Sequence, residues 1–185
     1  MTVAPRLRNL ALTATMPPGL RKLALTAHVT SSVGWLGAVV AFLALTITGL
    51  TSQDPKMVRA VYLAAEPITM FVIVPLAVAS LITGIVSSLG TPWGLFRHYW
   101  VLFKILLTVL ATIVLLQYTQ TVSQFADMAA ASEGVDVSGL RSYLLHSGVG
   151  LLVLLVTTIL AVYKPRGVTP YGWRKQQEER TLSQP

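Results

Sequence analysis

The chain has 185 residues, of which 54% are hydrophobic and 11% charged, and its mean hydropathy is +0.66. This composition is too apolar for a soluble domain of this length and is typical of a helical bundle in lipid. The absence of cysteine excludes disulfides, thiolate metal sites, iron–sulfur clusters and covalently attached c-type haem. The net charge is +7, but the basic residues flank apolar segments. Attraction to anionic lipid headgroups explains that pattern, so we expect no nucleic-acid partner.

Residues 1–22 are predicted to form a basic cytoplasmic arm, because their short apolar run leads into prolines and a second basic cluster rather than a signal cleavage site. Apolar segments follow over roughly 23–50, 60–89, 99–119 and 142–163. Each is long enough to cross a bilayer as a helix, which needs about 20 residues. Residues 164–185 are polar and basic and are predicted to form a cytoplasmic tail. The sequence therefore predicts an all-α protein with one transmembrane four-helix bundle over residues 23–163.

Local signals refine these elements. Pro67 and Pro75 fall inside the second segment, where each removes a backbone hydrogen bond and favours a kink. Residues 90–96 are rich in glycine and proline and predict a tight turn. Residues 120–140 are expected to form the longest connection, and the fourth helix is expected to end at Lys164–Pro165.

Basic residues are distributed unequally between the two sides of the predicted bundle. Ten of them lie before the first segment, between the second and third, or after the fourth, whereas the other two connections hold only Lys56, Arg59 and Arg141. Cytoplasmic loops carry the excess of Lys and Arg. The pattern therefore predicts that both termini face the cytoplasm.

Glu66 and His146 are predicted to lie at equal depth, each about five residues below the outer boundary of its helix. A carboxylate and an imidazole at one depth can share a proton or an ion pair, which reduces the cost of burying Glu66 in lipid. A pair of this kind handles protons or ions in some membrane proteins, and in others it only locks two helices together. The sequence leaves both alternatives open.

His28, His98 and Lys104 form a second group, near the cytoplasmic ends of the first and third segments. Histidine pairs on facing helices hold b-type haem in four-helix bundles, so His28 is a candidate haem ligand with His98 or His146 as the second. Arg97 and Lys104 are candidate contacts for haem propionates or lipid phosphate. The alternative for residues 97–100 is an ordinary anchor at the membrane interface.

Two motifs carry a resemblance to known proteins. Leu25, His28, Trp35 and Gly37 make the pattern Leu-x-x-His-x6-Trp-x-Gly at the start of a membrane helix. This pattern resembles the first helix of the copper-resistance D-like membrane proteins and of small bacterial integral membrane proteins without a known activity. Residues 90–100 (GTPWGLFRHYW) look like a loop of such proteins from actinobacteria. The resemblance implies a multi-pass protein of the bacterial inner membrane whose early histidine contacts metal or haem, although the chain lacks the Met- and Cys-rich motifs of copper handlers.

Three functions remain open. The first is an accessory membrane component with a b-type haem or a redox role, and without catalytic activity of its own. The second is a small transporter or an ion-coupled permeation subunit that uses Glu66 and His146. The third is a structural subunit of a larger membrane complex, and a bundle of this size favours a homo-oligomer or a larger partner.

Overall fold

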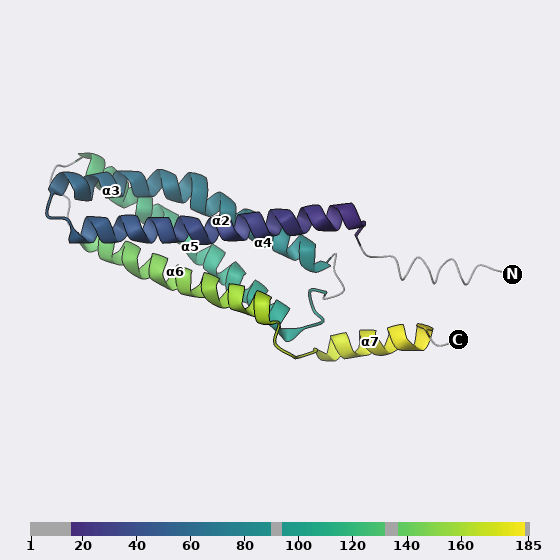
Figure 1. The fold of residues 1–185 in the computed structure, drawn as a ribbon. Helices are drawn as coiled ribbons and strands as arrows, with labels where there is room; N and C mark the ends of the chain where they lie inside the picture. Colours follow the sequence, from purple (N-terminus) through teal and green to yellow (C-terminus); the bar gives the residue numbers. More distant parts are fainter. Residues whose placement is uncertain (1–15, 90–93, 132–136, 184–185) are drawn as a thin grey trace.

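The computed structural model describes residues 16–89, 94–131 and 137–183. In chain order its elements are α2 (Pro18–Thr51), α3 (Pro55–Ile68), the π-helical turn η1 (Thr69–Ile73), α4 (Val74–Leu89), α5 (Tyr99–Ala131), α6 (Ser138–Tyr163) and α7 (Pro170–Ser183). These described ranges contain no strand, only a single antiparallel bridge between His98 and Val168. Figure 1 shows the long helices side by side, with α7 at one end.

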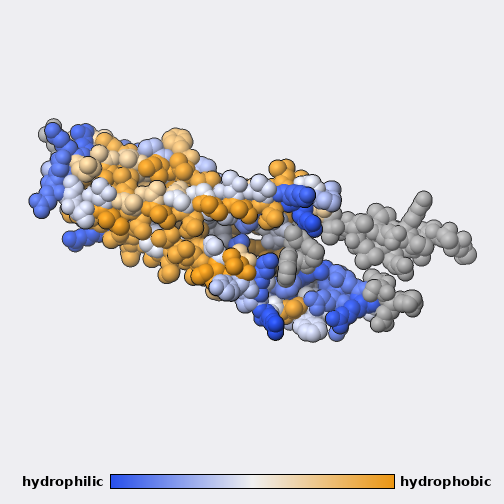
Figure 2. Space-filling model, viewed as in Figure 1, coloured by the Kyte–Doolittle hydropathy of each residue, from blue (hydrophilic) through white to orange (hydrophobic). Residues whose placement is uncertain are grey.

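Four helical runs are long and apolar enough to cross a membrane: Pro18–Thr51, Pro55–Leu89, Tyr99–Ala131 and Ser138–Tyr163. Their outer surface is apolar along the sides of the bundle, while hydrophilic residues gather at its two ends (Figure 2). This distribution is the one required where lipid surrounds the sides and water the ends. The prediction of an all-α four-helix bundle is confirmed.

The two ends differ in charge. We call one end of the bundle the basic end and the other the opposite end (Figure 1). The basic end holds α7, the starts of α2 and α5, and the ends of α4 and α6. The basic end carries Arg21, Lys22, Arg97 and Lys164 close to the helix termini. Because the number of crossings is even, the start of α2 and the end of α6 lie at the same end of the bundle.

Helix α5, the third crossing, is longer than predicted. We expected residues 120–140 to be a connection, but α5 continues to Ala131. The expectation was wrong because this polar stretch still buries Val122, Ala126 and Ala129 at helical spacing. The guanidinium of Arg59 on α3 closes the helix, since Nε donates to the carbonyl of Ala129 at 2.7 Å and Nη2 to that of Ala130 at 3.0 Å.

The second crossing accommodates its prolines through a wide turn rather than a break. Asp54 starts α3 by accepting a hydrogen bond from the backbone N–H of Lys56 at 2.9 Å. The π-helical turn η1 lies between Pro67 and Pro75, and the N–H of Val74 donates to the carbonyl of Thr69. A π-helical turn inserts one extra residue into a helix, so the chain remains helical from Pro55 to Leu89.

Aromatic side chains fill the bundle near the opposite end. The ring of Tyr143 is fully buried and lies 5.5 Å from the centroids of both Phe42 and Tyr62, and 5.8 Å from that of Phe125. Tilted and edge-on aromatic pairs at such distances stabilise beyond the area that they bury. This cluster joins α2, α3, α5 and α6 into one core.

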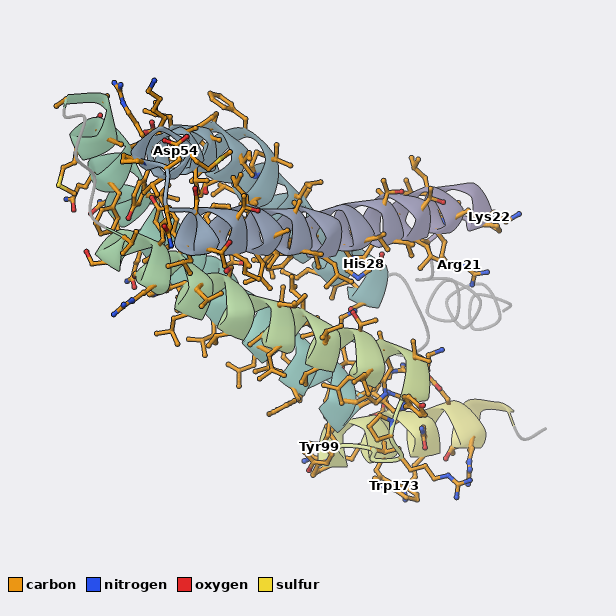
Figure 3. All side chains as sticks on the ribbon, turned by 60° about the vertical axis from the view of Figure 1, so that its left-hand side comes forward. Arg21, Lys22, His28, Asp54, Tyr99 and Trp173 are labelled. Carbon is orange, nitrogen blue, oxygen red and sulfur yellow. The ribbon has the colours of Figure 1, made fainter. Side chains whose placement is uncertain are left out.

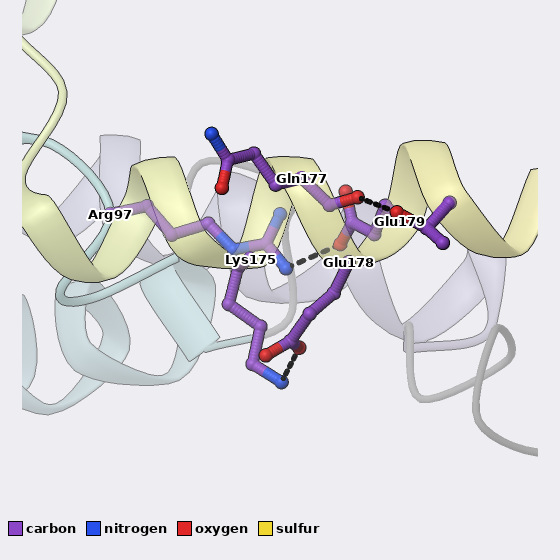
Figure 4. Close-up of polar contacts among 6 residues, drawn as sticks. Arg97, Lys175, Gln177, Glu178 and Glu179 are labelled. Atoms are coloured by element: carbon purple, nitrogen blue, oxygen red, sulfur yellow. Dashed lines mark hydrogen bonds and ion pairs between the residues drawn. The ribbon is translucent and has the colours of Figure 1, made fainter.

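At the basic end α7 is attached to the start of α5. Thr169 caps α7 by accepting from the N–H of Gly172 at 3.1 Å, and its hydroxyl donates to the carbonyl of Phe96. Arg97 forms an ion pair with Glu179 at 2.7 Å (Figure 4). The nearby Glu178 accepts a hydrogen bond from Lys175 and raises the pKa of that ammonium. The polar tail is therefore helical over Pro170–Ser183 and is held to the residues just before α5, at the end of the bundle.

The cap at the end of α5 gives a prediction. Arg59→Gln should lower the free energy of unfolding by about 1–2 kcal/mol, because two carbonyls lose a charged donor. Arg141→Gln is the matched control, since Arg141 is exposed at the same end of the bundle. Thermal unfolding in mild detergent measures the difference, and equal midpoints for the two variants would contradict the capping role.

Candidate functional site

A polar cluster lies inside the bundle, toward the basic end, around His28 of α2. The Nδ1 atom of His28 lies 3.1 Å from the carbonyl oxygen of Ser80 and 3.3 Å from the hydroxyl of Thr83, both on α4. The Nε2 atom lies 3.3 Å from Nζ of Lys104 on α5. The imidazole therefore bridges three helices.

These contacts fit one protonation state of the ring beside a charged lysine. A carbonyl oxygen only accepts, so Nδ1 must carry the hydrogen that is donated to Ser80. A lysine ammonium only donates, so Nε2 of His28 must be the acceptor toward Lys104. The geometry fits a neutral imidazole with its hydrogen on Nδ1, held beside a cationic Lys104.

Hydroxyl groups hold the histidine in place. The hydroxyls of Ser32 and Ser80 lie 2.8 Å apart, and those of Ser31 and Thr83 lie 3.4 Å apart, so both pairs join α2 to α4. Hydroxyl pairs between helices are typical of membrane proteins, where lipid offers no alternative partner. They fix the rotation of α2 against α4 and thereby the direction of the imidazole.

A glycine makes room for the ring. A Cβ atom at Gly84 of α4 would lie only 3.0 Å from Cε1 of His28. By contrast, a Cβ atom at Gly37 of α2 would meet nothing within 4 Å. The histidine thus packs directly against the backbone of α4, which only glycine allows without displacement.

The cluster faces a cavity of about 770 Å³ between α2, α4, α5 and α6. That volume lies within the range of small-molecule sites, about 300–1,000 Å³. The basic residues that line it are Arg21, His28, Lys104 and Lys164. The described lining residues include no Asp or Glu. Figure 3 shows His28 and Arg21 on the side of α2 that faces the gap, where α2 and α6 diverge toward the basic end.

One polar atom in the cavity wall has no partner. The hydroxyl oxygen of Ser87 on α4 is buried and makes no hydrogen bond to the described residues. A buried hydroxyl without a partner is destabilising unless water or a ligand satisfies it. Ser87 lies one turn beyond Thr83 toward the basic end.

Glu66 and His146 are not brought together as an ion pair. His146 is exposed on α6, where its ring stacks on Tyr118 with centroids 3.7 Å apart and its Nδ1 lies 2.9 Å from the carbonyl oxygen of Ser142. Glu66 is half-buried on α3 and forms no ion pair with His146 in the part of the chain that the structure describes. The proton- or ion-handling role of this pair stays a prediction.

His98 and Arg97 lie at the basic end but outside the cavity. His98 pairs through its backbone with Val168, and Arg97 pairs with Glu179 of α7. Among the described lining residues His28 is the only histidine, and both of its ring nitrogens contact protein groups. The second axial ligand that a bis-histidine haem needs is therefore absent from the described lining. Haem binding stays a prediction, as does the contact of Arg97 with lipid or propionate.

Sequence reasoning found part of this cluster. The sequence grouped His28 with Lys104 near the cytoplasmic ends of the first and third segments, but it did not show their contact with each other or with α4. Thr83 and Ser87 were missed. The signal that points to them is the density of hydroxyls in residues 80–88, where Ser80, Thr83, Ser87 and Ser88 all fall near one face.

Together the fold and the cluster indicate a multi-pass helical membrane protein with a cationic polar site inside its bundle. Comparison of the chain with protein-family models, with curated proteins and with solved structures gives no match. The resemblance to the copper-resistance D-like proteins stays a prediction, and the site must be interpreted from its own chemistry. Among the described residues no group of three or more His, Cys, Asp or Glu side chains could hold a metal ion.

The close packing at Gly84 can be tested directly. Gly84→Val should push the imidazole away from α4 and break the contact between Nδ1 and Ser80, because there is no room for a side chain. Nitrogen NMR of the ¹⁵N-labelled histidine side chains should then show His28 changing its tautomer balance. Gly37→Val is the control and should leave the His28 signals unchanged. Unaltered signals in the Gly84 variant would show that the ring does not pack there.

Proposed function

We propose that this protein binds an anionic ligand in the cavity at the basic end, with Lys104 as the central contact. The observation that carries the proposal is the charge of the cavity: its described lining combines Arg21, Lys104 and Lys164 with no carboxylate. Lys104 itself forms no ion pair with any described residue. A cation inside a membrane span is costly and is retained where it serves a ligand or a pathway.

The neighbouring histidine supports this role. An ammonium group has three N–H donors, and the described contacts use one of them, toward Nε2 of His28. The other two donors are available for a carboxylate or phosphate oxygen. His28 is anchored by α4, so it restricts where the flexible lysine side chain points and prepares it for the anion.

We further propose that the basic end faces the cytoplasm of a bacterium, with the protein in the plasma membrane. The support is the excess of Lys and Arg at the basic end over that in the two connections at the opposite end. In this orientation Lys104 is reached from the cytoplasmic side or from the inner leaflet. Anionic lipids are abundant there, and their negative surface attracts basic segments.

Two other functions have less support. A haem or redox role would use the same cavity, with His28 as a ligand and Lys104 beside a propionate, but it lacks a second histidine in the described lining. Ion-coupled permeation through Glu66 and His146 would require the two side chains to meet, and the stacking of His146 on Tyr118 opposes this. Assembly into a homo-oligomer or a larger complex stays compatible with each function.

The anion proposal predicts a preference that depends on charge alone. Octanoate and octan-1-ol have the same chain length, and only octanoate is charged. Because Trp35 and Trp100 line the cavity, tryptophan fluorescence of the purified protein can report the binding of both ligands. Wild-type protein should bind octanoate more tightly, and Lys104→Gln should reduce that preference about tenfold, the equivalent of ~1.4 kcal/mol. Lys175→Gln on α7 lies outside the described cavity lining and serves as the control. An unchanged preference in Lys104→Gln would overturn the proposal.

A further inference from the structure

The cavity opens sideways into the membrane. Several apolar residues of its wall are also exposed on the outer surface of the bundle: Leu25 at 56%, Val29 at 51% and Val33 at 63% on α2, and Val162 at 70% on α6. Exposed apolar side chains on a membrane-spanning helix contact lipid chains. The wall between α2 and α6 is therefore incomplete toward the basic end, where Figure 3 shows the two helices apart.

Polar and apolar side chains share the lining of the cavity. Its apolar part includes Leu36, Leu81, Ile85, Ile105 and Leu154. Lys104 and His28 belong to its polar part, and Arg21 lies one turn from the start of α2, at the basic end. A hydrocarbon chain fits beside the apolar residues, and a charged headgroup fits beside the basic residues.

We propose that the ligand of this site is an anionic lipid of the bilayer, which enters through the gap between α2 and α6. Its phosphate or carboxylate contacts Lys104 and Arg21, and its chain lies along Val29, Val33 and Leu154. This inference rests on the proposed function, because it names the ligand class of the same cationic site.

Charge argues against residues 1–15 of the chain as the occupant of the cavity. The first fifteen residues of the chain contain Arg6 and Arg8 and no Asp or Glu. A basic segment would bring like charge to Lys104 and Arg21, which costs free energy in a medium of low dielectric constant. An anion from the membrane instead neutralises the cavity.

The test uses lipids that quench tryptophan. In a chain with Trp93, Trp100 and Trp173 changed to Phe, the buried Trp35 at the cavity reports on bound lipid. The protein is reconstituted into phosphatidylcholine vesicles that contain an equal mole fraction of chain-brominated phosphatidylglycerol or chain-brominated phosphatidylcholine. Anionic brominated lipid should quench Trp35 at least about twofold more than the zwitterionic lipid, because a bromine within the cavity lies closer than one in bulk lipid.

Two variants locate the entry. Val29→Phe fills the lip of the gap and should remove the extra quenching, whereas Val40→Phe, also exposed on α2 but outside the described lining, should keep it. Equal quenching by both lipids in the parent protein would overturn the lipid proposal. If both lipids quench equally but Lys104→Gln still lowers the preference for octanoate, the protein has an anion site whose ligand is not a bilayer lipid. If both effects are absent, the proposed function fails as well.

Discussion

The structure depends on one constraint: lipid cannot form hydrogen bonds, so a polar group within the crossings is stabilised only by partners inside the bundle. Many hydroxyls meet it within their own helix, as where Thr46 donates to the carbonyl of Phe42 at 2.9 Å and Thr112 to that of Thr108 at 2.8 Å. Lys104 and His28 cannot do so. They lie on different helices, and their contact at 3.3 Å joins α2 to α5 across the bundle.

Different contacts join the helices in the two halves of the bundle. Near the opposite end the helices are joined by the aromatic cluster around Tyr143, whose side chain is fully buried. Toward the basic end α2 and α4 are joined by pairs of serine and threonine hydroxyls, while α6 diverges from α2 (Figure 3). The space left is the cavity.

The sequence alone predicted the crossings well, because long apolar runs can be satisfied only by helices in lipid. It also placed His28 and Lys104 at similar depth. It could not show that Arg59 would cap a longer α5, or that Thr169 would attach α7 to residue 96, because both contacts join segments about 70 residues apart. For Glu66 and His146 the sequence predicted similar depth, but it could not show that the ring of His146 stacks on Tyr118. The depth of a residue in the membrane can be predicted by counting along the helix, whereas the direction of its side chain depends on how the helices pack.

The central claim is that lipid surrounds four crossings, so that the start of α2 and helix α7 lie on the same side of the membrane. Since the chain has no cysteine, single cysteines report position without background. We would place one at exposed Gln53 between α2 and α3, one at exposed Gln177 on α7, and one at Val40, exposed in mid-crossing. A membrane-impermeant maleimide added to intact cells should label Gln53→Cys, should label Gln177→Cys only after permeabilisation, and should label Val40→Cys in neither state. Labelling of Gln53→Cys and Gln177→Cys from the same side, or rapid labelling of Val40→Cys, would contradict the account.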